Sequence, residues 1–374
     1  MKIALLLMGG GARAAYQVGV LRAIDEMLGH PTRNPFPILC GTSAGAINAA
    51  TLAVHASNFS AGVDDLFDVW SNFRARQVYR VDAFGIAGSG ARWLFALMFG
   101  WLVRQNLRAL FDNTPLGELL RAHLDLSRIQ DAIDSGALFA LSVTAFGYSS
   151  GESVSFFQAA LSAQSWGRMQ RAGARTKIAV EHLLASSAIP FCFPAVKIHR
   201  EYFGDGSLRQ VAPMSPAIHL GAERVLVIGV ANRSKHERRS AEGYPSPAQI
   251  GGHILSSIFL DSLEMDIERM RRVNNTVRMI PDGVLKENNV QLRSIDVMVI
   301  EPSQRLDQIA VSHLRALPWT VRGLLRSIGA MSKGGGAFAS YLLFEPSYTR
   351  ALIELGYKDA MHSSGELKKF VNGD

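Results

Sequence analysis

The chain has 374 residues and a formal net charge of +7, with 48% hydrophobic and 19% charged residues. This composition provides enough apolar material for a packed core and excludes an intrinsically disordered chain. The charge is modest for the length, so we expect no nucleic-acid partner, whereas an anionic membrane surface is compatible with it. Two cysteines, Cys40 and Cys192, cannot build a disulfide framework. We therefore expect a cytoplasmic protein, peripheral at most on the inner face of the membrane.

The apolar runs of the chain are short. Residues 3–8 lead directly into glycines, so we interpret them as a buried first strand rather than a signal peptide. The longest uninterrupted apolar run, residues 93–103, is too short to span a bilayer. We expect no transmembrane helix.

The first third of the chain alternates predicted strands and helices. The strand at 3–8 is followed by a helix over 14–28, and a short strand at 38–40 is followed by a helix that ends near Val54. Buried strands joined through helices predict a mainly parallel sheet that is covered on both faces.

The middle and the end of the chain have a different pattern. Residues 64–123 are helical in period and rich in Trp, Phe and Leu, which predicts a helical insertion. Strands are predicted over 138–145 and 154–157, as a hairpin, and over 196–199, 225–231 and 297–300. We expect an α/β domain over residues 1–300 and a helical region over 301–374.

The tract 41–45, Gly-Thr-Ser-Ala-Gly, is a G-x-S-x-G pentapeptide. It follows a short strand and opens a helix, which is the context that a nucleophile elbow requires. Gly41 and Gly45 would let the backbone turn sharply, and Ser43 would lie at the helix N-terminus, where negative charge is favoured. An ordinary strand–helix turn with a capping serine is the alternative interpretation.

The tract 9–13, Gly-Gly-Gly-Ala-Arg, also lies between a strand and a helix. A dinucleotide fingerprint requires Gly where this chain has Ala14, and a Walker A loop requires Gly-Lys, which the chain lacks. A third interpretation is an oxyanion hole formed by the backbone N–H groups of Gly10 and Gly11. Because both turns follow neighbouring parallel strands, we expect them at the same carboxyl edge of the sheet.

No histidine stands in a recognisable catalytic context. His236 begins a tract that resembles H-E-x-x-H, but residue 240 is serine, so we predict no zinc site. An acid offers another base: Asp205 is framed by Gly204 and Gly206 after a predicted strand. A plain Asp-Gly turn is the alternative for Asp205.

Four tracts in one order resemble the patatin-like phospholipase family. They are 9–13, 41–45, 185–194 (Ala-Ser-Ser-Ala-Ile-Pro-Phe-Cys-Phe-Pro) and 205–207 (Asp-Gly-Ser), and the resemblance covers residues 3–218. It implies a three-layer α/β/α fold and hydrolysis of acyl esters, chiefly of phospholipids and neutral lipids. It also implies a Ser–Asp dyad that works without histidine, metal or cofactor.

Carried onto this chain, the resemblance makes Ser43 the nucleophile and Asp205 the base. The loop from Gly9 to Gly11, with Arg13 beside it, would form the oxyanion hole. The chain departs from the family pattern at two positions, with Ala14 in place of Gly and Ser207 in place of Gly or Ala.

The expected chemistry is acyl transfer through a serine ester, which divides one difficult step into two. A carboxylate with an ordinary pKa near 3.9 is a poor base for a hydroxyl, and partial desolvation in a closed pocket would raise that pKa. We therefore expect a lipid acyl hydrolase. An acyl-CoA thioesterase or acyltransferase on the same fold is one alternative, and a catalytically silent lipid-binding protein is another.

Two segments suggest contact with lipid. Residues 93–103 are apolar on every face and bracketed by Arg92 and Arg104, which is compatible with an interfacial lid or with a buried helix. Residues 318–331 form an amphipathic basic helix, for which we favour a docked surface helix with a solvated charged face. We expect binding to anionic vesicles to exceed binding to zwitterionic ones. The oligomeric state is not predicted.

Overall fold

The computed structural model describes most of the chain. The described residues are 2–82, 109–231, 246–281, 284–288, 292–331 and 335–373. The apolar run at 93–103, considered above as a lid or a core helix, lies outside them.

In the described part of the chain, ten strands form one sheet, and its central strands are parallel. Their spatial order is β10-β9-β1-β2-β3. These strands are β1 (Ile3–Leu7), β2 (Ile38–Thr42), β3 (Ala140–Gly147), β9 (Arg224–Ile228) and β10 (Asp296–Ile300). The mainly parallel sheet predicted from the alternation of strands and helices is confirmed.

The other half of the sheet is mixed. β4 (Ser153–Ala159) pairs antiparallel with β3, which confirms the predicted hairpin. β6 (Arg171–Arg175) and β5 (Trp166–Arg168) extend the sheet beyond β4. β8 (Glu201–Asp205) pairs antiparallel with the last residues of β3, and β7 (Val196–Ile198) pairs with β8.

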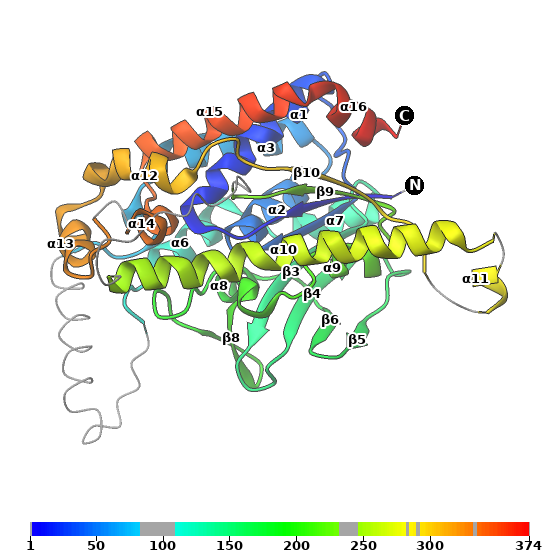
Figure 1. Ribbon diagram of the computed structural model, residues 1–374, viewed down its shortest axis with the longest axis horizontal. Helices are drawn as coiled ribbons and strands as arrows, with labels where there is room; N and C mark the ends of the chain where they lie inside the picture. The colour runs from blue at the N-terminus through cyan, green and yellow to red at the C-terminus, as the bar shows by residue number, and fades with distance from the viewer. Residues whose placement is uncertain are drawn as a thin grey trace.

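Helices cover both faces of this sheet, and β1 shows the division (Figure 1). Leu5 and Leu7 belong to one hydrophobic core, whereas Leu6 and Met8 belong to a second core on the opposite face. The first face is covered by α1 (Ala15–Met27), α2 (Ala44–Val54), α3 (Phe59–Asn72), α7 (Arg128–Asp134), α8 (Val180–Ser186), α15 (Pro346–His362) and α16 (Ser364–Asn372). The second face is covered by α9 (Ser215–His219) and α10 (Pro247–Met279). The result is the expected three-layer α/β/α architecture.

The described part of the predicted insertion is helical. α3 leads into α4 (Ala75–Val78), and α6 (Thr114–His123) follows the segment that is not described. A short helix, α11 (Val284–Glu287), follows α10. Within the described ranges, no helix combines the length and the apolar character needed to cross a bilayer.

The C-terminal region is helical, as predicted, and packs on the core. It contains α12 (Leu306–His313), α13 (Trp319–Ser327), α14 (Gly336–Leu342), α15 and α16. Two glycines let α15 approach α1 closely: a Cβ on Gly19 would lie 1.9 Å from the carbonyl oxygen of Ile353, and one on Gly356 would lie 2.1 Å from that of Tyr16. α12, α13 and α14 lie at the carboxyl end of the parallel strands, away from both termini (Figure 1).

Candidate active site

Ser43 lies in a sharp turn between β2 and α2, with φ 55° and ψ −132°. The turn leaves no room for side chains around it. A Cβ on Gly41 would lie 2.4 Å from the carbonyl oxygen of Gly45, and one on Gly45 would lie 2.3 Å from that of Leu7. The strand–turn–helix context expected for residues 41–45 is therefore confirmed.

The sheet register brings Asp205 next to this turn. β4 occupies one edge of β3 along its length, so β2 and β8 share the other edge. Thr42, the last residue of β2, is the partner of Thr144, and Asp205 is the partner of Ala145. Ser43 and Asp205, which are far apart in the sequence, therefore follow each other along one edge of β3.

Burial decides the electrostatics of Asp205. Its side chain is almost fully buried, and this burial raises the pKa of its carboxyl group from 3.8 to about 6, whereas hydrogen bonding with Ser43 and Ser207 offsets part of the rise. Oδ1 accepts a hydrogen bond of 2.9 Å from the backbone N–H of Ser207. Oδ2 is buried, and among the described residues no donor lies at the distance and angle of a regular hydrogen bond to it. A carboxyl group with a pKa near 6 is a better base at neutral pH than an ordinary aspartate.

Two buried side chains that the sequence analysis did not single out support the turn. Ser186, at the end of α8, accepts a hydrogen bond from the backbone N–H of Ser43 (2.9 Å) and donates one to the carbonyl oxygen of Thr144 (2.6 Å). Gln210 donates to the hydroxyl of Thr42 (2.8 Å). Ser186 belongs to the tract 185–194 that carries the family resemblance, but nothing in the local sequence indicates its contact with the Ser43 turn.

The loop at Gly9–Gly11 lies beside the turn, because Leu7 and Gly41 are partners in the sheet. Gly11 has a φ of 55°, and a Cβ on it would lie 2.3 Å from the carbonyl oxygen of Tyr341. It begins a short 3₁₀ helix, η1 (Gly11–Ala14), and the first N–H groups of such a helix have no partner within it. Gly11 and Ser43 line the same cavity.

Arg13, expected beside the oxyanion hole, is buried next to the glycine loop. Its guanidinium does not reach the cavity wall but packs against α14. It donates hydrogen bonds to the Ser340 hydroxyl (2.8 Å), the Tyr341 hydroxyl (3.2 Å) and the Ala337 carbonyl oxygen (3.3 Å). It also lies 4.0 Å from the centre of the Tyr341 ring. Arg13 therefore fastens the glycine loop to the C-terminal helices.

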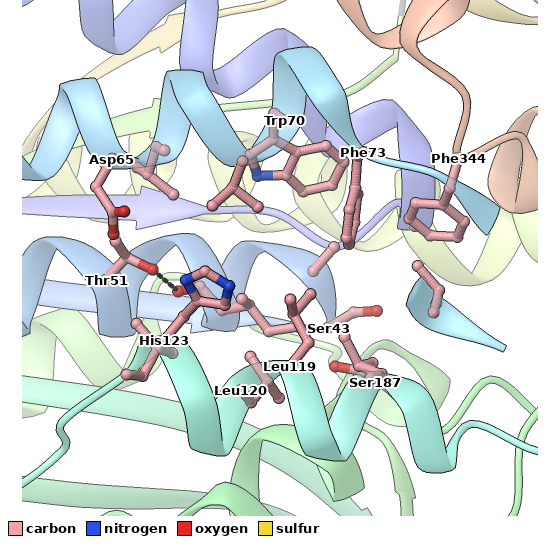
Figure 2. A pocket seen from close by; sticks show the side chains of 18 of the residues that line it. Ser43, Thr51, Asp65, Trp70, Phe73, Leu119, Leu120, His123, Ser187 and Phe344 are labelled. Carbon is pink, nitrogen blue, oxygen red and sulfur yellow. Dashed lines mark hydrogen bonds between the residues drawn. The ribbon is translucent and has the colours of Figure 1, made fainter. Parts of the chain in front are cut away.

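A cavity extends from Ser43, and the space between its walls, with the solvent at its open mouth included, is about 790 Å³. Figure 2 shows Ser43 and Ser187 at one end and, at the other, Thr51, Asp65 and His123. Apolar side chains form most of the wall between these ends: Ile47, Leu66, Val69, Trp70, Phe73, Val78, Leu116, Leu119, Leu120, Leu124, Ile189, Phe193 and Phe344. This shape and chemistry suit a hydrocarbon chain.

Among the described residues that line the cavity, His123 is the one histidine. It is exposed and lies at the end far from Ser43 (Figure 2). The part of the chain that the structure describes also contains no cluster of three or more side chains suited to a metal ion. The titratable group that the sheet register brings beside the Ser43 turn is Asp205, which makes it the candidate base.

Comparisons with known proteins agree with this geometry. The family model of patatin-like phospholipases matches residues 5–218. A cGAMP-activated phospholipase of Pseudomonas aeruginosa is 28% identical over 219 residues, which are 58% of this chain and 55% of that protein. A cUMP-AMP-activated phospholipase of Escherichia coli is 50% identical over 50 residues, 13% of this chain and 16% of that protein.

The chain thus matches about half the length of the first relative. A solved structure, VipD from Legionella pneumophila, aligns with 98% of this chain and 67% of its own, at 13% identity and a TM-score of 0.38. The family model covers more than half of the chain and includes both Ser43 and Asp205. The chain belongs to the patatin-like phospholipase family.

Proposed function

We propose that the protein is a serine acyl hydrolase that cleaves fatty-acyl esters of phospholipids or other lipids through a dyad of Ser43 and Asp205. The observation that carries the proposal is that Ser43 lines one end of an apolar cavity and that the buried Asp205 lies next to the Ser43 turn. A strained serine turn follows a buried carboxyl group along the same strand edge, and the pKa of that carboxyl is raised to about 6. Family membership supports the class of reaction.

In the first step, the Ser43 oxygen attacks the ester carbonyl carbon while its proton moves to Asp205. The new C–O bond gives a tetrahedral oxyanion. The backbone N–H groups of the glycine loop, at Gly10 and Gly11, would donate hydrogen bonds to this oxyanion, and each such donor stabilises it by about 3 kcal/mol. Collapse breaks the bond to the leaving alcohol, which takes the proton from Asp205 and leaves an acyl-serine ester.

In the second step, Asp205 removes a proton from a water molecule, and the oxygen of that water attacks the acyl-serine carbonyl. Collapse of the second tetrahedral species releases the fatty acid, and the proton returns to Ser43. The carboxylate form of Asp205 is needed at the start of both steps. Because the pKa of Asp205 is about 6, turnover should rise with pH through this value.

The cavity supports an acyl chain as the part of the substrate that is bound. Ser43, Ile47 and Thr51 lie along α2 and span eight residues, which is a rise of about 12 Å. An extended hydrocarbon advances about 1.2 Å per bond, a third of the length of an extended peptide residue. This wall therefore accommodates roughly ten bonds of an acyl chain before the polar end of the cavity.

A serine-reactive fluorophosphonate probe tests the nucleophile, and a defined lipid panel read by mass spectrometry tests the substrate. We expect labelling of the wild-type protein at Ser43, none of folded Ser43→Ala, and release of fatty acid from phospholipids. Wild-type turnover by folded Ser43→Ala would contradict the dyad. Acyl transfer to an added acceptor, or selective cleavage of acyl-CoA, would favour the transferase or thioesterase alternative. A protein that binds lipid without labelling would be the silent binding protein.

A small-molecule regulator belongs to this proposal because both curated relatives are named as activated by cyclic nucleotides. We propose that hydrolysis by this protein increases in the presence of such a molecule. The same lipid assay, run with cGAMP, with cUMP-AMP and with AMP as control, tests it. Equal rates with all three would contradict activation by these nucleotides.

A further inference from the structure

α13 has two different faces. Val321 and Leu325 are fully buried against the core, so this helix is anchored independently of its outer face. Trp319 and Arg326 are exposed on the side away from these residues. Arg322 lies on the flank of the helix, half-buried, and its guanidinium donates a hydrogen bond to the carbonyl oxygen of Arg315 (3.1 Å). The docked helix predicted from the sequence is therefore present, and its outer stripe, together with this flank, combines one aromatic ring with two cations.

Two large apolar side chains are exposed near this stripe. Trp319 exposes 71% of its surface and Phe191 exposes 76%. Phe191 has a φ of 63°, a backbone conformation that side chains rarely adopt. A single exposed apolar residue is normal on a protein surface. Two exposed aromatic side chains in adjoining segments are less usual, and grouped apolar exposure of this kind indicates an interaction surface.

Backbone contacts join the segments that carry these residues. The Thr320 hydroxyl of α13 donates to the carbonyl oxygen of Val81 (2.6 Å). The neighbouring Arg80 donates through its backbone N–H to Asp112, and Leu110 donates likewise to the carbonyl oxygen of Phe191 (2.9 and 2.8 Å). α13, residues 79–82, residues 110–112 and Phe191 therefore form one continuous surface.

The inner side of this surface is the cavity wall. Phe73, Val78 and Phe193 line the cavity, whereas their neighbours Arg74 and Phe191 are exposed. A bilayer in contact with the outer side would therefore lie one layer of residues from the space that receives the acyl chain.

The charge of the surface is positive. The docking face, as we call it, consists of Arg74, Arg76, Arg80, Phe191, Arg315, Trp319, Arg322 and Arg326. Among the described residues of these segments, the acids are Asp82 and Asp112. Glu345 is a third acid nearby, and Arg74 and Arg76 attract its carboxylate electrostatically. Six arginines against three acids leave an excess of positive charge.

We propose that the docking face binds an anionic lipid bilayer and places the cavity against it. Aromatic rings are favoured at the level of lipid headgroups, and arginines beside them keep their charged ends among anionic headgroups while their stems cover apolar surface. Each basic residue near such a surface contributes about 1 kcal/mol. The role of this docking in catalysis rests on the proposed lipid substrate. The docking itself does not, because vesicle binding is measured without turnover.

The test compares vesicles of phosphatidylcholine alone with vesicles that also contain phosphatidylglycerol, at low and high salt. We expect the wild-type protein to bind the anionic vesicles more tightly, with a difference that shrinks at high salt. Trp319→Ser should weaken binding to both vesicles on the order of tenfold. The double variant Arg322→Ser/Arg326→Ser should weaken binding to anionic vesicles by about 30-fold and change binding to phosphatidylcholine little.

Matched controls lie at the opposite end of the molecule, where α10 ends far from α13 (Figure 1). Met279 exposes 83% of its surface, and Arg271 and Arg278 are exposed on the same helix. Met279→Ser and Arg271→Ser/Arg278→Ser should bind both vesicles as the wild-type protein does. Hydrolysis of a short soluble ester should be unchanged in all of these variants, because none of the residues lies at the dyad.

Wild-type binding by Trp319→Ser would overturn the proposal, and so would an equal loss in the control variants. Self-association of the wild-type protein that Trp319→Ser abolishes, without vesicle binding, would also overturn it and assign the face to a second copy of the chain. Specific vesicle binding by a protein that hydrolyses neither lipid nor short ester would support the docking face and contradict the proposed function.

Discussion

At Ser43 the backbone holds a conformation that favours glycine, with φ 55° and ψ −132°. Such a conformation costs a residue with a side chain about 1–3 kcal/mol, and the surrounding structure must maintain it. Here the hydrogen bond from the Ser43 N–H to Ser186 and the close packing around Gly41 and Gly45 do so. The strain positions the hydroxyl at the end of the cavity.

A glycine substitution separates the strain from the chemistry. We expect Ser43→Gly to be more stable than Ser43→Ala by about 1 kcal/mol, because glycine adopts this conformation without a steric penalty. Both variants should be inactive, because neither has a hydroxyl. Urea unfolding of the two proteins measures the difference. Equal stabilities would show that the turn at Ser43 is not strained.

Asp205 is expected to lower the stability of the fold at the pH where the proposed mechanism uses its carboxylate form. The pKa of its carboxyl is about 6 in the folded protein and 3.8 without the fold. As pH rises between these values, the unfolded chain loses its proton more readily, so the free energy of unfolding falls. Above about pH 6 the loss is complete, and a shift of this size is worth on the order of 3 kcal/mol.

The Asp205→Asn variant should therefore be inactive yet more stable than the wild-type protein at pH 7, with the difference vanishing near pH 4. Unfolding in urea at several pH values measures it. Asp65→Asn, at the partly exposed far end of the cavity, is the control for the loss of a carboxylate from this region and should leave stability at pH 7 unchanged. A lower stability of Asp205→Asn at pH 7 would mean that the buried carboxylate is well compensated.

Whether a strand or helix could be predicted depended on how clearly its apolar residues are grouped in the sequence. β1 and β2 are continuous apolar runs, so the sequence predicted them, together with the turns at Gly9–Gly11 and Ser43 that follow them. β5 and β6 were missed because their sequences, Trp-Gly-Arg and Arg-Ala-Gly-Ala-Arg, contain no apolar run. α10 was not predicted, because its apolar and polar residues are mixed along the sequence without one distinct apolar stripe.

Contacts between distant residues were beyond a local pattern. The guanidinium of Arg13 bonds to α14, more than 300 residues later, and nothing near Arg13 in the sequence indicates this. Asp205 was predictable as a candidate from its flanking glycines, but its position beside Ser43 depends on how β2 and β8 share one edge of β3. The pairing of strands that are far apart in sequence supplied that information.

α2 is expected to set the acyl-chain preference, because Ile47 lies halfway along the cavity wall that it forms. Ile47→Trp should fill the cavity about 6 Å from Ser43. We expect this variant to hydrolyse four-carbon esters normally and to lose activity on ten-carbon esters by about tenfold or more. Ile47→Leu, with a similar volume, is the control. The measurement is the rate of ester hydrolysis as a function of acyl-chain length for both variants. An unchanged profile for Ile47→Trp would mean that the acyl chain binds elsewhere.

For the whole molecule, the N-terminal motifs and the C-terminal helices act as one unit. α15 crosses α1 at paired glycines, Phe344 contributes to the cavity wall, and Arg13 holds α14. The family model ends at residue 218, yet the cavity beside Ser43 is completed by a residue far beyond that point.

Arg13→Lys should therefore lower both stability and turnover. Lysine keeps the charge but cannot reproduce the planar set of hydrogen bonds to Ser340, Tyr341 and Ala337. We expect a loss of about 2 kcal/mol of unfolding free energy. The kcat for a short ester should fall by about tenfold with little change in KM, because the glycine loop shifts while the cavity remains. Ser340→Ala removes one of these bonds and should have a smaller effect; full activity of Arg13→Lys would contradict a positioning role.

α10 has a mechanical consequence for the site. It is 33 residues long, about 50 Å, and it contacts both η2 (Gly206–Arg209), directly after Asp205, and α14, which holds Arg13. Asp266 of this helix also accepts a hydrogen bond from the backbone N–H of Met214 (3.0 Å). One helix thus contacts the supports of the proposed base and of the glycine loop, while its far end extends to the opposite end of the molecule (Figure 1). Because this one helix contacts both supports, we expect a displacement of α10 to move the two sides of the site together.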